Sequence, residues 1–147
     1  MKPPVTIDGL MSEWSKDTII DSSSMEKELL KISFLHGKYL NIMSYHRHMI
    51  RKIEADYKEM KEIRRDYYQG HTGLDTLEKY GWDVFPFTLK SDITTYLDAD
   101  EDINKYKAKK ILHEEIVDVC IAIIKELNSR TYQLRDFIAW ERFVNGG

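Results

Sequence analysis

Hydrophobic side chains from Ser24 to Gln69 recur at alternating steps of three and four residues. With heptad position a placed at Leu29, this spacing runs through more than five heptads without a slip or a proline. The stripe at positions a, d and g consists of Leu29, Ile32, Leu35, His36, Tyr39, Ile42, Met43, His46, Met49, Ile50, Ile53, Tyr57, Met60, Ile63, Arg64 and Tyr67. Such a wide stripe predicts one long helix that packs against several other helices.

The sequence also marks where this helix should begin and end. Ser24 is suited to the N-cap position, and Gly70 is suited to the left-handed position that follows a last helical turn. At about 1.5 Å per residue, an unbroken helix of this length would measure roughly 70 Å. That length is unusual for a chain of 147 residues. We therefore expect a bend, at Gly37 or at residues 41–44, or a partner subunit.

Shorter helical patterns flank the long helix. We expect these helices at residues 10–16, 91–97, 103–127 and 134–144. Asn128 and Ser129 are expected to break or kink the chain between the last two. The sequence therefore predicts an all-α single domain with four parts. They are an N-terminal arm and short helix (1–23), the long basic helix (24–70), an irregular connector (71–97) and C-terminal helices (98–147).

The stretch from 70 to 90 is the least regular part of the chain. It combines glycines with several aromatic residues. Phe85, Phe87 and Leu89 alternate along it, which is typical of a short strand, and Pro86 would restrict that strand to a sheet edge. The aromatic residues of 80–87 fit either core burial or a platform for stacking.

Composition and charge limit the possible functions. A net charge of −3 with 32% charged residues excludes a generally basic nucleic-acid coat but not a local basic strip. Cys120 is the only cysteine, which excludes an internal disulfide and favours an intracellular protein with a buried thiol. No segment approaches the ~18 apolar residues of a membrane span, and the first residues lack a hydrophobic signal core. We expect a soluble, cytoplasmic protein.

Motifs for catalysis or metal binding are incomplete. His113-Glu114 begins like a zinc-protease helix, but Val117 occupies the position of the second histidine. The acidic run 98–102 begins like a calcium loop, but Ile103 replaces the required glycine and Lys109 the required glutamate. Negative charge at the start of a helix accounts better for that run. We expect no enzyme activity, no metal and no cofactor.

The basic residues of the long helix form a pattern. Between positions 47 and 65 there are seven basic and four acidic residues, which gives +3 in a chain of net −3. Heptad positions b and e define a basic ridge, which reads Arg47, Arg51, Glu54, Lys58, Lys61 and Arg65. Such a ridge would present cations to successive phosphates of an extended strand, with Tyr57, Tyr67 and Tyr68 nearby to stack on bases.

The alternative interpretation of the basic ridge is an ordinary solvent-exposed helix face with ion pairs such as Glu54 and Lys58. The pattern alone leaves both interpretations open. A second basic group, at Lys105, Lys107, Lys109 and Lys110, is spread around its helix, which favours an ordinary solvated surface.

Several short motifs occur in a characteristic order. They are Ile20-Asp21-Ser22, Ile53-Glu54-Ala55, Arg65-Asp66-Tyr67-Tyr68-Gln69-Gly70, Leu97-Asp98-Ala99-Asp100-Glu101-Asp102 and Ser129-Arg130. Together they resemble the UvsY family of recombination mediators of T4-type bacteriophages, over roughly Asp17 to Gly146. The segment from Thr72 to Phe87 is longer than the family pattern.

This resemblance implies a non-enzymatic protein that acts in the cytoplasm of an infected bacterial host. It implies a ring-like homo-oligomer, hexameric or heptameric, that binds single-stranded DNA without sequence preference. Its implied partners are a UvsX-type recombinase and the phage single-strand-binding protein, whose coated strands receive the recombinase. The main alternative is a helical scaffold or adaptor that binds no nucleic acid, and a hydrolase or metal enzyme is a more distant one.

The resemblance also assigns residues. Arg64 falls on a DNA-contacting position of the family, whereas Glu62 stands where a basic residue would be expected. Combined with the ridge, this predicts a DNA-binding set of Arg47, Arg51, Lys58, Lys61, Arg64, Arg65, Tyr67 and Tyr68. The C-terminal part of the family drives assembly, which here points to Leu134, Phe137, Ile138, Trp140 and Val144.

Overall fold

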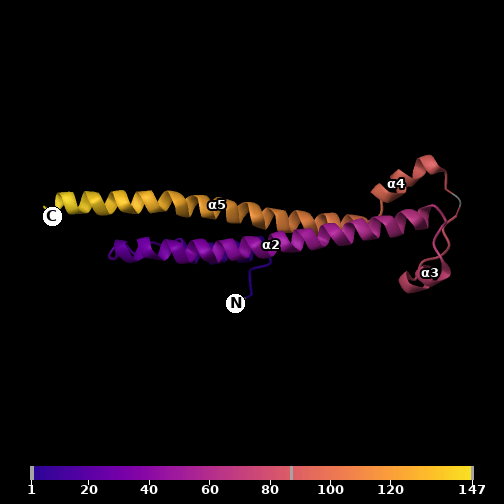
Figure 1. The fold of residues 1–147 in the computed structure, drawn as a ribbon, viewed down its shortest axis with the longest axis horizontal. Coiled ribbons are helices and arrows are strands. Elements are labelled where there is room, and N and C mark those ends of the chain that lie inside the picture. Colours follow the sequence, from indigo (N-terminus) through magenta and orange to yellow (C-terminus); the bar gives the residue numbers. More distant parts are fainter. Residues whose placement is uncertain (1, 87, 147) are drawn as a thin grey trace. The chain divides into compact units, whose positions relative to one another are not determined.

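The computed structural model describes residues 2–86 and 88–146, and these residues fold as helices and connecting loops without a strand. In chain order the elements are α1 (Ile7–Asp17), α2 (Met25–Tyr68), α3 (Leu74–Tyr80), the 3-10 helix η1 (Lys90–Asp92), α4 (Ile93–Asp98) and α5 (Glu101–Val144), shown in Figure 1. The predicted all-α class is confirmed. Within the described residues, no helix has the length and apolarity that a membrane crossing needs.

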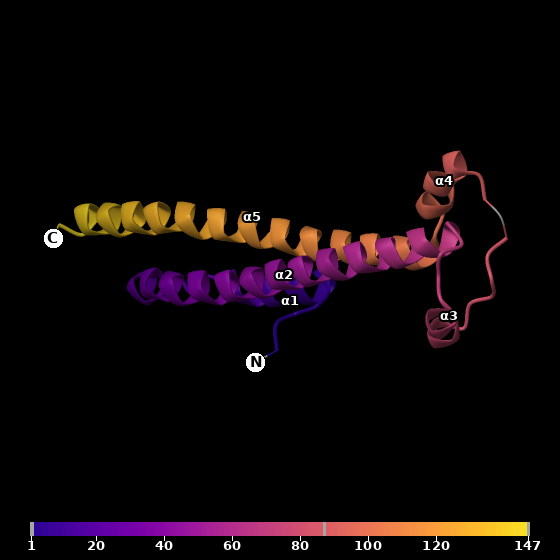
Figure 2. The same cartoon turned by 45° about the vertical axis from the view of Figure 1, so that its right-hand side comes forward.

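The chain divides into two compact units, and each unit contains a part of α2 and a part of α5. Unit 1 combines Met1–Met49 with Leu112–Gly147, and unit 2 is Ile50–Ile111. In each unit a part of α2 lies beside a part of α5 (Figures 1 and 2).

The long helix predicted from the heptad pattern is confirmed, because α2 differs from the expected range by one residue at each end. The Glu28 N–H donates to the Ser24 carbonyl at 3.1 Å, where the helix begins. At its end Gly70 has φ 77°, and the next N–H, that of His71, donates to the Asp66 carbonyl at 2.9 Å. This arrangement satisfies carbonyls that a helix end leaves without partners. The helix continues through Gly37 and residues 41–44 without a break.

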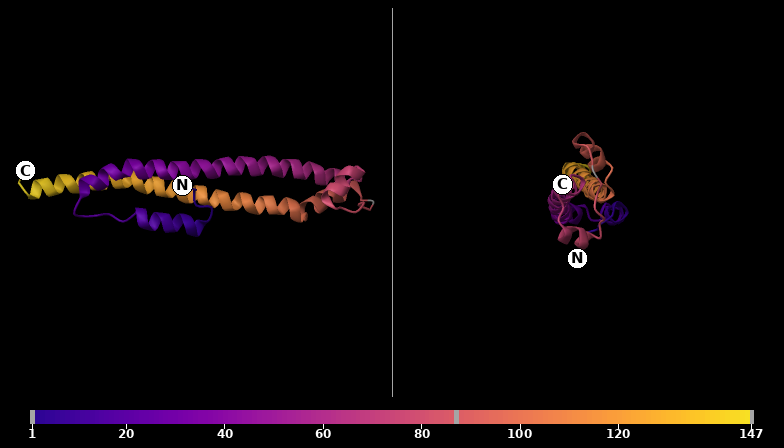
Figure 3. Two further views of the ribbon diagram at one scale, coloured as in Figure 1. Left: turned by 90° about the horizontal axis from the view of Figure 1, so that it is seen from below. Right: turned by 90° about the vertical axis from the view of Figure 1, so that its right-hand side faces the viewer.

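In unit 1, α1 lies against the first part of α2 (Figures 2 and 3). Asp17 accepts hydrogen bonds from the Lys38 ammonium at 2.6 Å and from the Tyr39 hydroxyl at 2.8 Å. The guanidinium of Arg130, on α5, donates to the Thr18 carbonyl at 3.1 Å. These contacts connect the N-terminal helix to both long helices.

A histidine pair lies in the core of unit 1. His46 is fully buried, as a polar residue of a packed interface, and its Nδ1 lies 2.7 Å from Nδ1 of His113. The other ring nitrogen of His46 lies 2.7 Å from the Pro4 carbonyl oxygen. Burial, with a smaller contribution from the charge of His46, lowers the pKa of His113. The neutral form of His113 is therefore favoured. The contact of His46 with the Pro4 carbonyl holds the N-terminal segment on α2.

Unit 2 has its own apolar cluster. Ile93 and Leu97 of α4 meet Ile103 of α5, and Tyr57 and Met60 of α2 pack against them. Helix α3 was not expected within the irregular connector. It is only seven residues long and is bounded by Gly73 and Gly81. Glycine favours loops in a sequence pattern, and so it concealed a helix whose buried side chain is Leu77.

The suggested edge strand is wrong where it can be checked. Residues 84–86 and 88–89 form no strand, and Phe87 lies outside the described residues. The Phe85 ring instead packs edge-on against Tyr68, with the two ring centroids 4.9 Å apart. Aromatic packing, rather than pairing with another strand, accounts for the hydrophobic residues of this stretch.

The expected break at Asn128 and Ser129 is also wrong, since α5 continues to Val144. The reason is a second uninterrupted heptad pattern that passes through this point. Its core positions are Ile103, Tyr106, Lys110, His113, Val117, Cys120, Ile124, Leu127, Thr131, Leu134 and Ile138. Asn and Ser are only slightly unfavourable in a helix, by less than about 0.7 kcal/mol each. Packing on both sides of them outweighs that local preference.

Candidate nucleic-acid interface

The basic ridge lies along α2 and is largely accessible. Arg47, in unit 1, is exposed, as are Arg51 and Lys58 in unit 2, whereas Lys61 and Arg65 are partly buried. Arg65 forms an exposed ion pair with Glu62 at 2.7 Å. Among the described residues, no carboxylate lies within ion-pair distance of Arg51, Lys58 or Lys61. Their charges are therefore available to an external anion.

The acidic member of the ridge is matched by a lysine from the neighbouring helix. Glu54 Oε1 lies 3.0 Å from Nζ of Lys110 on α5. The two residues belong to the lining of a cleft of about 200 Å³ between α2 and α5 in unit 2. The other lining residues are Ile53, Tyr57, Tyr106 and Lys107.

Two lysines lie near the ring of Tyr57, which lines this cleft. Nζ of Lys61 lies 5.7 Å from the centroid of the Tyr57 ring, and Nζ of Lys107 lies 5.9 Å from the same centroid. Both distances fall within the range in which an ammonium group is attracted to an aromatic face. Lys61 of α2 and Lys107 of α5 thus both place a positive charge close to the Tyr57 ring.

Arg64, by contrast, is engaged within the chain. Its Nη2 donates to Asp102 at 2.6 Å, and its Nε lies 3.0 Å from Asp100 Oδ2, off the direction of a hydrogen bond. The centre of its guanidinium lies 3.8 Å from the centroid of the Trp82 ring. Two carboxylates at the start of α5 therefore balance the charge at this predicted DNA-binding position.

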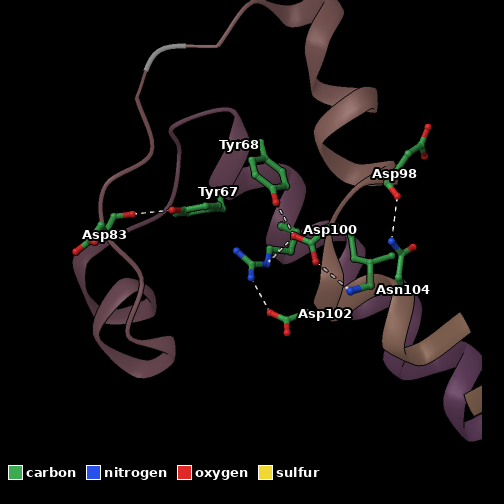
Figure 4. A network of polar contacts seen from close by, with 9 residues as sticks. Tyr67, Tyr68, Asp83, Asp98, Asp100, Asp102 and Asn104 are labelled. Carbon is green, nitrogen blue, oxygen red and sulfur yellow. Dashed lines mark hydrogen bonds and ion pairs between the residues drawn. The ribbon is translucent and has the colours of Figure 1, made fainter. Parts of the chain in front are cut away.

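Asp100 is the centre of this polar network (Figure 4). Only 4% of the residue is exposed, and its Oδ1 accepts the Ile103 N–H at 3.0 Å, which caps the start of α5. Its Oδ2 accepts the Tyr68 hydroxyl at 2.5 Å. Burial, followed by this hydrogen bond, raises the pKa of Tyr68 above its usual value. The phenol therefore stays protonated and acts as a donor.

Tyr67 and Tyr68 are also packed against other rings. The Tyr67 ring centroid lies 4.9 Å from that of Trp82, and its hydroxyl donates to the Asp83 carbonyl at 2.8 Å. Tyr68 stacks on Tyr96 at 5.5 Å. Tyr80 and Trp82, from the stretch that suggested a stacking platform, stack on each other at 4.6 Å. The predicted stacking tyrosines therefore have internal partners.

The residues predicted for assembly lie near the end of α5. Leu134 is buried in unit 1 and Ile138 is half-buried, whereas Phe137, Trp140 and Val144 are 44%, 62% and 58% exposed. Phe143, which is not among the predicted assembly residues, is 79% exposed, and its ring lies 6.1 Å from that of Trp140. The spacing of three residues between these two rings could have identified Phe143, because such residues share a helix face.

Cys120 and the side chains that could bind a metal are candidates for a further site. Burial raises the pKa of the Cys120 thiol to about 11, which keeps it protonated near neutral pH. In the described part of the chain, no three His, Cys, Asp or Glu side chains gather in a way that could hold a metal ion.

Comparison with known proteins gives consistent matches. Residues 13–147 match the family model described as "UvsY: Recombination, repair and ssDNA binding protein". The recombination protein uvsY of Enterobacteria phage T4 is 28% identical over 140 residues, which are 95% of this chain and 98% of that protein. A crystal structure of the bacteriophage T4 recombination mediator protein UvsY, lattice type II, aligns with a TM-score of 0.75 and 26% identity over 96% of this chain and 98% of that one. Its lattice type I structure aligns with a TM-score of 0.74 and 26% identity, over 91% and 97% of the two chains.

Proposed function

The chain belongs to the UvsY family of recombination, repair and single-stranded-DNA-binding proteins, and we propose that it is a recombination mediator that binds single-stranded DNA along the basic ridge. The observation that supports this site is the accessible charge of Arg51, Lys58 and Lys61 on one edge of α2. Arg65 extends the same edge within unit 2, and Arg47 is the member of the ridge that belongs to unit 1.

The physical basis of binding is counterion release. Each lysine or arginine that neutralises a phosphate releases a condensed ion, so affinity depends steeply on salt and weakly on sequence. Arg64, Tyr67 and Tyr68 stay predicted contacts, but DNA would have to displace their internal partners first. We therefore propose that Arg51, Lys58 and Lys61 make the principal contacts.

We further propose that copies of the chain form a hexamer or heptamer. Phe137, Trp140 and Val144 supply exposed apolar surface for such an assembly, and Ile138 and Leu134 support it from beneath. Repetition of a weak ridge in each subunit raises the affinity for one long strand through avidity. The assembled protein would load a UvsX-type recombinase onto strands coated by the phage single-strand-binding protein. It would do so without catalysis of its own, in the cytoplasm of the infected host.

Charge reversal of the ridge tests this proposal. We expect Lys58→Glu, Lys61→Glu and Arg65→Glu, combined, to weaken binding of a fluorescent oligonucleotide by 100-fold or more at low salt, because three phosphate contacts become repulsive in each subunit. Light scattering should give an unchanged mass. The matched control reverses three other exposed lysines, Lys16, Lys27 and Lys125.

The comparison of the two triple variants decides between the candidate functions. Equal loss in both would show that only net charge matters, and the ridge would not be the site. If the unaltered protein itself does not bind oligonucleotide at low salt, the scaffold or adaptor function is favoured instead.

A further inference from the structure

We propose that α5 takes part in holding the strand, through a phosphate site formed by Lys61 and Lys107 beside the Tyr57 ring. This inference rests on the proposed DNA-binding function and extends it to a second helix. It assigns a binding role to Lys107, which the sequence pattern places on an ordinary solvated surface.

The arrangement of charge is the first argument. Lys61 comes from α2 and Lys107 from α5, yet their Nζ atoms lie 5.7 and 5.9 Å from one ring centroid. Among the described residues, neither ammonium has a carboxylate within ion-pair distance. Two cations that lie near one ring without a counter-charge attract an anion, and a phosphate is the anion that a DNA-binding helix meets.

The Tyr57 ring makes this site more ordered than two free surface lysines would be. Lysine side chains are flexible, and binding that immobilises them costs conformational entropy. Attraction to the ring restricts both side chains before a ligand arrives. A partly pre-arranged pair loses less entropy when it binds a phosphate.

The second argument is that a lysine of α5 offsets the negative charge of the one acidic residue on the ridge. Glu54 is the only acidic member of the ridge and would repel a strand that follows α2. Its carboxylate lies 3.0 Å from Nζ of Lys110. A strand that passes this point therefore meets a carboxylate that has a lysine of α5 beside it, so Glu54 repels the strand less than an isolated carboxylate would.

The lining of the cleft is compatible with this use. The cleft has a volume of about 200 Å³. Its walls include the rings of Tyr57 and Tyr106. Such walls suit one unit of a polymer, whose phosphate meets the lysines and whose base or sugar contacts an aromatic ring.

A single charge removal on α5 tests the proposal. We expect Lys107→Gln to weaken oligonucleotide binding and to reduce the slope of log affinity against log salt by about 0.7 for each engaged subunit, the value for one phosphate contact with a single strand. Lys105→Gln is the matched control, because Lys105 is an exposed lysine two residues away on the same helix. Lys107→Arg should keep the slope. Equal slopes for Lys107→Gln and Lys105→Gln would overturn the proposal.

The role of Lys110 has its own test. Lys110→Gln should weaken binding, because Glu54 then repels the strand, and adding Glu54→Gln should restore it. Failure of that restoration would contradict the argument that Lys110 offsets the charge of Glu54.

A third measurement uses the unaltered protein. Acetylation of lysines with and without a bound oligo-dT strand, read by mass spectrometry, should show protection of Lys61 and Lys107 but not of Lys105. Protection that is confined to α2 would overturn the inference while leaving the proposed function intact. Absence of any binding or protection would instead overturn the proposed function itself.

Discussion

At the scale of single residues, Asp100 explains why the neighbouring residues Arg64 and Arg65 of α2 differ in their contribution to stability. Its buried carboxylate is stabilised by the Tyr68 hydroxyl, the Ile103 N–H and the charge of Arg64. Arg65, one position further on, has only an exposed pair with Glu62 on its own helix. Arg64 therefore contributes to the stability of unit 2, whereas Arg65 is free to exchange its partner for a phosphate.

This difference predicts unequal costs for the same substitution. We expect Arg64→Met to lower the free energy of unfolding by about 3 kcal/mol, because it leaves a buried carboxylate without its cation. Arg65→Met should cost less than about 0.5 kcal/mol, since exposed pairs contribute little. Urea denaturation at fixed protein concentration measures both. Similar values for the two variants would mean that Asp100 does not need Arg64.

At the scale of elements, the long-range heptad pattern was the informative signal. It predicted α2 to within one residue at each end, with Gly70 at the left-handed stop. A second pattern of the same kind runs across Asn128 and Ser129, where the low helix propensity of these two residues wrongly predicts a break. Helix α3 is too short to show periodicity, so only the packing of Leu77 identifies it.

The same contrast applies to the candidate site. The basic ridge could be predicted because its members lie on one helix, where sequence spacing fixes geometry. The partners of Arg64, and the approach of Lys107 and Lys110 to the ridge, depend on which parts of α2 and α5 face each other. These charged residues lie between 36 positions apart, for Arg64 and Asp100, and 56 positions apart, for Glu54 and Lys110. Such separations carry no local signal of contact, so these features required the structure.

Substitution by alanine should have opposite effects on stability at two glycines, Gly37 inside α2 and Gly70 just after its end. Gly37 lies inside the helix with nothing within 4 Å of an added Cβ, so Gly37→Ala should raise the free energy of unfolding by about 0.5–1 kcal/mol. Gly70 has φ 77°, which disfavours a Cβ, so Gly70→Ala should lower it by about 1–2 kcal/mol. Thermal melting followed by circular dichroism tests the signs. Destabilisation by Gly37→Ala would indicate that this helix face is covered in the assembled protein.

At the scale of the whole molecule, function depends on how many ridges act together. One subunit offers only a few free cations, and a few phosphate contacts give weak, salt-sensitive binding. The exposed Phe137, Trp140, Phe143 and Val144 would account for the assembly that multiplies them. Contiguous exposed apolar surface of this kind marks an interaction site in a protein that stays dissolved.

Assembly and DNA binding should therefore separate experimentally. We expect Trp140→Ser with Phe143→Ser to lower the mass seen by light scattering and to leave helix content unchanged, because both side chains are exposed. Affinity for a long oligonucleotide should fall about 100-fold or more through loss of avidity, whereas binding of a strand that spans one subunit should hardly change. Leu74→Ser with Val84→Ser, which alters two equally exposed apolar residues of unit 2, is the control. An assembly that survives the first pair of substitutions but not the second would place the subunit contact in unit 2.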